Sequence, residues 1–512
     1  MKACIVSLSL LFGTVFGAVG DNCWPKVIFP GDYPDPSIMR DGRDFYLTWS
    51  GGDSRPGLTV YHSQDLIHWT ALSCAAQTFA NPIWAPEIVK IDGKYAIYFP
   101  AKGDFNPPRK WNVYRVTAPE MKGPWSMPEL VVANAGIDPG VARDDDGTVW
   151  LWLHHGKRVK LDTTGAKAVG QIEGKRYRGW RFPEEWRPGT KNLTLESPKL
   201  FKRGGWWYMV SAQGGTGMPL TAHMAIVARS KSPAGPWENS PYNPLVRAKS
   251  ASEEWWCTGH ATLFDDVQGN WWAVYHGYRN SFMTLGRSIL LAPIAWSKDG
   301  WPILDKSGRK PLPPTGSVVV GGDYDDDFEG DSLSLNWQTF GNDVSGKTRI
   351  AEGSLRLVAV EGASTSGEGA FPGTVLLFKP SAKSYAASVD METCAGVRSG
   401  LVLFYDRGNY AGVTTDGRDF ILRFPDGTRR CEPNPFGRRV RFHLRNDLNR
   451  LSLYAEGSSG RRTRLMDGID VSQMRHGKGR CKNFRSLHIG LVAEGRGEAS
   501  FGSFRYRVTA LP

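Results

Sequence analysis

One carboxylate in the sequence is restrained on both sides by proline. Asp35 lies between Pro34 and Pro36 in the stretch GDYPDPS, directly before an apolar segment. Each proline restricts its own backbone and that of the residue before it, so we expect Asp35 to be held in an extended conformation. A solvated surface acid needs no such restraint. The arrangement therefore indicates a side chain that must point in one direction.

The unit that begins at Asp35 recurs four times along the chain. Its first position is taken in turn by Ala85, Asp138, Glu196 and His260, at intervals of 50, 53, 58 and 64 residues. Each is followed by a short apolar segment, a turn containing glycine and acids, and an aromatic segment, which together signal a β-hairpin. Strand-only repeats of this length predict a β-propeller, here with five blades.

Equivalent positions of a propeller converge, because the innermost strand of every blade faces the central axis. We therefore expect Asp35, Asp138, Glu196 and His260 to meet in one pocket. Carboxylates gathered away from water raise each other's pKa values, and desolvation raises them further. A chain that accepts this cost at matching places is predicted to have a functional site there.

Two carboxyl groups across a cleft are the requirement for glycoside hydrolysis. One protonated carboxyl assists the leaving group, while a carboxylate activates water or attacks the sugar. A third acid can tune the pKa of the first. The chain also holds 20 tryptophans, whose rings suit the C–H faces of sugars. The alternative from another class is a propeller lectin, which would not need three acids at equivalent positions.

Seven motifs in order carry a resemblance to glycoside hydrolase family 43, the group of β-xylosidases, α-L-arabinofuranosidases and arabinanases. They are YPDPS, WAPE, IDPG, LESPKLFK, SAQGGTG, GHATLF and LGRS, and they extend over the whole repeat region. The resemblance implies a five-bladed propeller that inverts the anomeric centre. It also implies that Asp35 is the general base and Glu196 the general acid, and that Asp138 raises the pKa of Glu196 and orients it.

The same resemblance implies binding roles for four further positions. Trp84 in WAPE and Arg287 in LGRS would contact the sugar in the innermost subsite. Gln213 in SAQGGTG stands where relatives often carry glutamate, so a subsite contact would be altered there. His260 would lie near the axis, where some members hold Ca²⁺ or a cluster of water molecules; no cofactor is required for the reaction itself.

The family implies a plant cell-wall polysaccharide or oligosaccharide as substrate, namely xylan, arabinoxylan or arabinan. We expect an exo-acting β-xylosidase first and an α-L-arabinofuranosidase second, with an arabinanase less favoured. A retaining propeller glycosidase that acts on fructans would carry its nucleophile in an Asn-Asp-Pro setting, whereas Pro34 precedes Asp35 here.

A second domain is predicted after residue 320. All tryptophans but Trp337 lie at or before Trp301, and residues 305–327 are rich in proline, glycine and charge. In RRVRFHLRN, residues 438–446, apolar and basic residues alternate as in a half-buried strand. Many such runs predict a β-sandwich, and DDFEGDSLSLNWQTF resembles the concanavalin A-like (jelly-roll) domain of many family 43 β-xylosidases. The whole chain is thus expected to be all-β: residues 21–320 form the propeller and 321–512 the sandwich.

Residues 1–20 read as a signal peptide, with Lys2, a short apolar run and small residues at the end. We therefore expect a secreted, extracellular protein, or a periplasmic one in a bacterium, with no membrane span. The remaining six cysteines permit disulfides. A net charge of +12 in an exported protein does not favour nucleic acid as a partner. Asn192 begins a glycosylation sequon that we expect to be unused, and the oligomeric state stays open.

Overall fold

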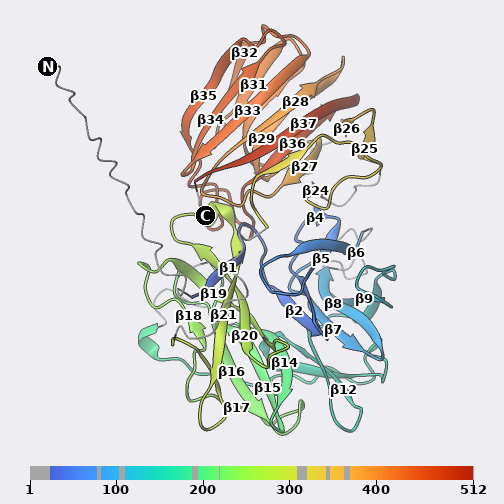
Figure 1. Ribbon diagram of the computed structural model, residues 1–512, viewed down its shortest axis with the longest axis vertical. Helices are drawn as coiled ribbons and strands as arrows, with labels where there is room; N and C mark the ends of the chain where they lie inside the picture. Colours follow the sequence, from blue (N-terminus) through green and yellow to red (C-terminus); the bar gives the residue numbers. More distant parts are fainter. Residues whose placement is uncertain are drawn as a thin grey trace, which may run out of the picture.

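The computed structural model describes residues 24–77, 82–102, 110–186, 194–217, 219–307, 320–341, 346–361 and 370–510. It consists of two β domains, with the propeller in the lower half of Figure 1 and the sandwich in the upper half. The predicted signal peptide and Asn192 lie outside the described residues. Within them no helix is long and apolar enough to cross a membrane. The five cysteines that fall within these ranges are all free.

The propeller has the five blades that the repeats predict. The first blade contains β2 (Ser37–Asp41), β3 (Asp44–Thr48), β5 (Gly57–Ser63) and β6 (Thr70–Ala76), and the second contains β7 (Glu87–Ile91), β8 (Lys94–Lys102), β9 (Trp111–Ala118) and β10 (Glu129–Val132). The third contains β11 (Gly140–Arg143), β12 (Val149–Leu153) and β13 (Lys157–Leu161), and the fourth contains β14 (Leu195–Arg203), β15 (Trp206–Gln213), β16 (Met224–Ser230), β17 (Glu238–Asn239) and β18 (Val246–Arg247). The fifth contains β19 (Trp255–Asp265), β20 (Trp271–Arg279), β21 (Arg287–Trp296) and β22 (Pro302–Leu304).

The ring of blades is closed by the first strand of the described chain. β1 (Lys26–Phe29) pairs antiparallel with β21 of the fifth blade, with Lys26 opposite Leu291 and Val27 opposite Leu290. Phe29 is fully buried and packs among the aromatic side chains of the first blade. The last blade is thus completed by residues that directly precede the first, which joins the two ends of the propeller.

Two eight-stranded sheets form the sandwich and confirm its predicted class. One, the β28 sheet, contains β25 (Thr348–Ala351), β26 (Ser354–Ala359), β37 (Gly497–Ala510), β28 (Ser384–Glu392), β33 (Arg439–Asp447), β34 (Arg450–Glu456) and β35 (Arg462–Asp470), with β23 (Tyr324–Asp326) beside β37. The other, the β29 sheet, contains β32 (Arg429–Pro433), β31 (Asp419–Arg423), β30 (Asn409–Thr415), β29 (Val397–Asp406), β36 (His488–Gly495), β27 (Thr374–Phe378), β24 (Trp337–Phe340) and β4 (Ser54–Arg55). Val440, Phe442 and Leu444 of β33 are buried, as the alternation predicts.

The last strand of the β29 sheet comes from the propeller. β4 lies in the loop between β3 and β5 of the first blade, and it pairs with β24 so that Arg55 is opposite Thr339 and Ser54 opposite Phe340. Ser486 of the sandwich also donates a hydrogen bond of 2.9 Å to Asp32 of the propeller. One sheet therefore contains segments of both domains, which fixes the sandwich against one end of the propeller (Figure 1).

A buried ion pair joins the inner strands near the propeller axis. Lys199 of β14 lies 2.5 Å from the Glu87 carboxylate of β7 and also donates to the carbonyl of Pro86 at 2.7 Å. Ser37 of β2 donates to the same carboxylate at 3.0 Å. Both charged side chains are at most 7% exposed. The contact links three blades directly beside the segment where the candidate catalytic residues lie.

We predict that breaking this pair destabilises the propeller. The variant Lys199→Met leaves the Glu87 carboxylate buried without its cation, which should cost about 3–5 kcal/mol of unfolding free energy. Urea unfolding followed by tryptophan fluorescence measures the change. The double variant Lys199→Met/Glu87→Leu removes both charges and should recover part of the loss; a double variant no more stable than the single one would contradict this reading.

Candidate active site

A cavity of about 860 Å³ opens at the end of the propeller that faces the sandwich. Asp35, Ala85, Asp138, Glu196 and His260 all line it. The five positions that begin the sequence repeats therefore do converge on one space. Asp35 and Asp138 are at most 8% exposed, so at least two of the three acids are withdrawn from water.

The backbone at these positions differs from the prediction. Asp35 has φ 57°, so the expected extended conformation between the prolines is wrong. Asp138 and His260 share this left-handed geometry, with φ 61° and 50°. Such geometry costs about 1–2 kcal/mol for most residues, although aspartate tolerates it better. For Asp35 a compensating contact is visible, because its N–H donates to Nδ1 of His276 at 3.0 Å.

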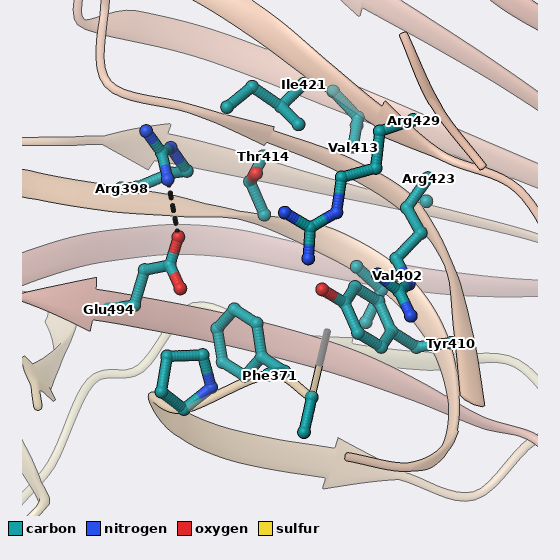
Figure 2. A pocket seen from close by; sticks show the side chains of 13 residues that line it. Phe371, Arg398, Val402, Tyr410, Val413, Thr414, Ile421, Arg423, Arg429 and Glu494 are labelled. Carbon is teal, nitrogen blue, oxygen red and sulfur yellow. Dashed lines mark hydrogen bonds and ion pairs between the residues drawn. The ribbon is translucent and has the colours of Figure 1, made fainter. Parts of the chain in front are cut away.

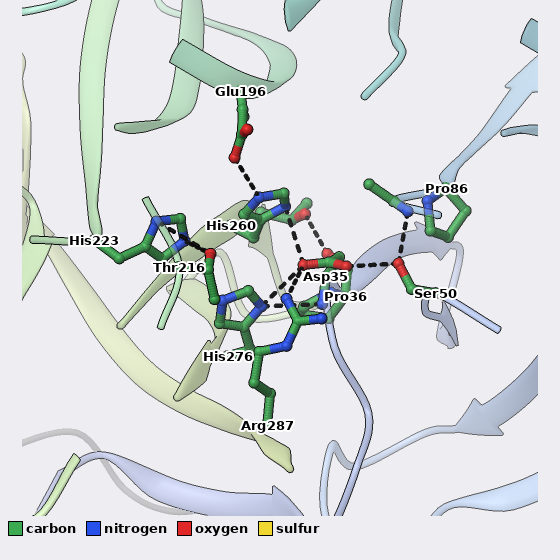
Figure 3. Close-up of polar contacts among 12 residues, drawn as sticks. Asp35, Pro36, Ser50, Pro86, Glu196, Thr216, His223, His260, His276 and Arg287 are labelled. Atoms are coloured by element: carbon green, nitrogen blue, oxygen red, sulfur yellow. Dashed lines mark hydrogen bonds and ion pairs between the residues drawn. The ribbon is translucent and has the colours of Figure 1, made fainter. Parts of the chain in front are cut away.

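Asp35 is held by two donors in addition to that backbone contact (Figure 3). The Ser50 hydroxyl donates to Oδ2 at 2.6 Å, and Nη1 of Arg287 donates to Oδ1 at 2.7 Å. Burial alone would raise the pKa of Asp35, but the charges of Arg287 and His260 outweigh it and hold the pKa well below its usual range. Asp35 is therefore an ionised carboxylate at neutral pH, which is the state that a base requires.

A histidine ring separates Asp35 from Glu196. His260 places Nδ1 at 3.5 Å from Asp35 and Nε2 at 3.5 Å from Glu196. Burial opposes protonation of this ring, but Asp35 and Glu196 raise the pKa of His260. His223 and His276 stack beside it, with ring centroids 5.4 and 5.2 Å from its own. Burial lowers the pKa of His223 to about 4, so this neighbour stays neutral.

The pKa values of Asp138 and Glu196 are shifted in opposite directions. Burial, followed by the negative charge of Glu196, raises the pKa of Asp138 to about 7. Glu196 is half-buried; desolvation would raise its pKa, but its ion pair with His260 lowers the pKa instead. The resemblance implies a raised pKa at Glu196, whereas in the free protein the raised pKa of the pair is that of Asp138. The difference arises because the Glu196 carboxylate lies 3.5 Å from Nε2 of His260. Asp138 does not approach that ring as closely.

Aromatic side chains from both domains form the cavity walls. Trp84 lines the cavity as expected and packs against Trp111, with 4.4 Å between ring centroids. Phe484 of the sandwich is 46% exposed and also lines the cavity, with the Arg287 guanidinium 5.8 Å from its ring. Other sandwich residues that line the cavity include Gln338, Phe340, Leu377, Lys379, Tyr405, Lys482, Asn483, Arg485 and His488.

Gln213 is placed differently from the other candidates. Its side chain is buried and donates to the Trp180 carbonyl at 2.6 Å, and it does not line the cavity. The predicted subsite contact therefore has no support in the geometry. Gln213 ends β15, and its amide instead fixes the segment that carries Trp180.

Several residues of the site were missed by sequence analysis. Ser50 closes the first repeat unit and His276 lies in the aromatic strand of the fifth, so both were inside segments that had been recognised as repeats. A comparison of the last positions of the repeats could have found them. The loop residues 482–485 carry no such signal, because they reach the cavity only through the packing of the second domain.

Asp138, Glu196 and His260 could approach a single ion, because their ligand atoms lie within 4.8 Å of one another. Ca²⁺ prefers six to eight oxygen ligands. This group offers two carboxylates and a ring nitrogen, and a Ca²⁺ bound there would occupy the candidate acid and its neighbour. The donor set therefore does not fit Ca²⁺.

Comparisons with known proteins identify the family of both domains. The model of Glycosyl hydrolases family 43 matches residues 24–302, and the Beta xylosidase C-terminal Concanavalin A-like domain matches residues 325–507. The chain belongs to glycosyl hydrolase family 43. This confirms the predicted family, and with it the enzyme class of the glycoside hydrolases. The two matched regions lie on either side of the boundary expected near residue 320.

Similar proteins carry two kinds of name. A non-reducing end α-L-arabinofuranosidase of Bacteroides ovatus is 33% identical over 64% of each chain. A putative β-xylosidase of Escherichia coli is 30% identical over 64% of this chain and 67% of that protein. The chain thus spans about two thirds of the length of these relatives. The crystal structure of the family 43 protein BlXynB from Bacillus licheniformis shares the fold, with a TM-score of 0.81, 23% identity and coverage of 95% of this chain and 99% of that one.

We predict a pH-dependent stability difference at Asp138. Its raised pKa means that the folded protein holds this proton more tightly than the unfolded chain, whose aspartate titrates near about 4. That stabilisation is complete below pH 4 and is lost as the pH rises through about 7. Asp138→Asn cannot ionise, so it should gain stability over the parent protein between pH 4.5 and pH 8.

Urea unfolding of both proteins at these two pH values measures the effect. The matched control is Asp145→Asn, at an acid that is 77% exposed and ion-paired with Lys202 on the surface. Its difference from the parent should change little with pH. An Asp138→Asn difference that is the same at pH 4.5 and pH 8 would show that Asp138 is not protonated in the folded state.

Proposed function

We propose that the protein is an inverting exo-glycosidase that releases a terminal pentose from xylan- or arabinoxylan-derived saccharides, with β-xylosidase as the first choice. The observation that carries this proposal is the shape of the site. Three carboxyl groups lie in a cavity that the sandwich covers on one side, through Phe340, Phe484 and their neighbours. A cavity walled in this way suits the end of a saccharide chain, whereas an endo-acting enzyme needs a cleft open at both ends.

The proposed reaction begins at Asp35. As a carboxylate it takes a proton from water, whose oxygen attacks the anomeric carbon. Inverting enzymes separate the two carboxyl groups by about 6.5–9.5 Å to hold that water, whereas retaining enzymes separate them by about 5–5.5 Å. The His260 ring lies between Asp35 and Glu196 with a 3.5 Å contact on each side. This spacing favours the inverting arrangement.

Departure of the leaving group requires a proton on its oxygen. We assign its delivery to Glu196, with Asp138 as the neighbouring carboxyl that stores the proton of the pair in the free protein. A substrate oxygen that displaces the His260 contact would remove the cation that lowers the pKa of Glu196. The proton would then favour Glu196, because burial raises the pKa of an unpaired carboxyl. Arg287 meanwhile keeps Asp35 ionised.

Two alternatives remain in view. An α-L-arabinofuranosidase is favoured by the name of the Bacteroides relative that is 33% identical. A non-catalytic propeller that binds carbohydrate would keep the tryptophans but has no need for the Arg287–Asp35 and Asp138–Glu196 arrangement.

We further propose that the protein is exported, on the basis of residues 1–20, and that its partner is a plant cell-wall polysaccharide.

Chromogenic substrates test the activity and the two roles together. The parent protein should hydrolyse 4-nitrophenyl β-D-xyloside or α-L-arabinofuranoside, and the larger kcat/KM identifies the sugar. Loss of a general acid or base typically costs about 10²–10⁴-fold. Asp35→Asn should lose this much on every substrate. Glu196→Gln should lose much less on a 2,4-dinitrophenyl glycoside, whose leaving group needs no proton.

The matched control for these variants is Glu254→Gln, at an exposed acid paired with Arg279. It should retain the activity of the parent. If Glu196→Gln binds saccharides normally and the parent hydrolyses neither chromogenic substrate nor any xylan or arabinan, the binding propeller is the correct interpretation. Equal losses of Glu196→Gln on good and poor leaving groups would remove Glu196 from the role of acid.

The stereochemical course is a separate prediction. Proton NMR of the reaction mixture, recorded before mutarotation, should show first the sugar with the anomeric configuration opposite to that of the substrate. This outcome follows from direct attack by a water held between Asp35 and the sugar. Retention of configuration would instead require a covalent intermediate and would refute the inverting assignment.

A further inference from the structure

Figure 2 shows a small pocket on the β29 sheet. Its lining residues Phe371, Val402 and Tyr410 belong to a cluster separate from the core between the two sheets. Alternate residues of β29 distinguish the two faces: Leu401 and Leu403 belong to the core between the sheets, whereas Val402 packs with Tyr410 and Phe371 on the outer face. The pocket has a volume of about 250 Å³. It is smaller than typical pockets for drug-sized ligands, so it suits a single sugar ring rather than an oligosaccharide.

Cations outnumber anions in this pocket. Arg398, Arg423 and Arg429 line it together with one carboxylate, Glu494. Arg398 forms an ion pair with Glu494 at 2.8 Å. Among the described residues, neither Arg423 nor Arg429 has a carboxylate partner in any ion pair that the structure contains. Two guanidinium groups are therefore left without a counter-charge.

Arg423 is the most deeply buried of these three arginines. Its residue is only 5% exposed, and its Nε is buried without a hydrogen-bond acceptor within the described chain. One Nη donates to the Gly408 carbonyl at 3.2 Å, and the guanidinium lies 4.5 Å from the centre of the Tyr410 ring. Burial also lowers its pKa. A buried charge with unused donors is costly unless a partner completes it.

Two arginines on one strand of the opposite sheet are, by contrast, paired with acids. On β33 of the β28 sheet, Arg439 pairs with Glu392 at 3.1 Å and Arg441 pairs with Asp390 at 2.6 Å. The basic face that the sequence predicts for this strand is thus neutralised by acids of the adjacent strand.

The groups in the pocket match a sugar acid. A guanidinium presents paired N–H donors that suit a carboxylate, and Tyr410 and Phe371 offer aromatic surface for a sugar ring. We propose that this pocket is a secondary anchoring site for a uronic acid residue of an acidic polysaccharide. The choice of a polysaccharide rests on the proposed function; the preference for a carboxylate rests on the pocket alone.

The pocket and the active cavity are joined by one cluster of apolar side chains. Phe340 and Leu377 line the active cavity, and both pack in the same outer-face cluster as Tyr410 and Phe371. Phe404 links them, with its ring centroid 5.0 Å from that of Phe340 and 6.4 Å from that of Tyr410. A polysaccharide held by its acidic side group in the pocket would therefore remain on the face of the sandwich that borders the active cavity.

Affinity electrophoresis of the full chain tests the proposal. The gels contain either glucuronoxylan or the same polymer with its carboxyl groups reduced to alcohols, and the Asp35→Asn background prevents hydrolysis. We expect binding to the acidic polymer to be about tenfold tighter or more, equivalent to at least one charge-assisted contact. Arg429→Ala, at an exposed position, and Arg423→Met should each remove most of this preference.

Arg439→Ala on the β28 sheet is the matched control, because it removes an equally positive but ion-paired side chain, and it should keep the preference. Arg429→Ala with Asp35 intact should hydrolyse the chromogenic pentosides at the parent rate, so a failure of the proposed activity is scored separately. Equal retention in the two gels, an equal effect of Arg439→Ala, or displacement by sulfate as effective as by glucuronate would overturn the proposal. A thermal melt of each variant verifies folding.

Discussion

The ion pair between Arg287 and Asp35 is the contact on which most of the site depends. Arg287 begins β21 of the last blade and Asp35 directly precedes β2 of the first, so the pair lies where the propeller closes. β1 joins the same two blades by backbone hydrogen bonds to β21. The charge that keeps Asp35 ionised is thus supplied across the seam of the ring. Correct closure and a competent base are consequences of one packing arrangement.

Buried charged groups lie at two successive levels along the inner strands of the propeller. The first layer holds the carboxyl groups, His260 and the left-handed backbone of Asp35 and Asp138. A second layer, beginning two residues later at Ser37 and Glu87, contains the buried pair with Lys199. β2, which follows Asp35, and β14, which carries Glu196, are joined in the second layer through Glu87 of β7. Strain at functional positions persists only where the surrounding structure over-determines it.

Much of this organisation could be predicted from the sequence, and the failures have a physical pattern. The five blades, the sandwich and the convergence of the repeat positions follow from periodicity, which is local information. The opposite pKa shifts of Asp138 and Glu196 could not be predicted, because they depend on how closely His260 approaches each carboxyl group. The left-handed φ of Asp35 depends on His276, 241 residues away. Gln213 matched a motif, but its partner is a backbone carbonyl that no motif specifies.

The short strand β4 has a consequence for how such a protein can change. Ser54 and Arg55 complete a sheet of the sandwich, while Gly51, Gly52, Asp53 and Ser54 line the active cavity. A loop of the first blade thus serves both as structural edge and as cavity wall. A sandwich taken from a relative would have to pair its edge strand with this loop. It would also have to place residues equivalent to Phe484 and Arg485 in the wall of the active cavity. The two domains are distinct in the sequence, but they share a sheet. We therefore expect a chimera of two relatives to fold only when β4 and β24 come from the same parent.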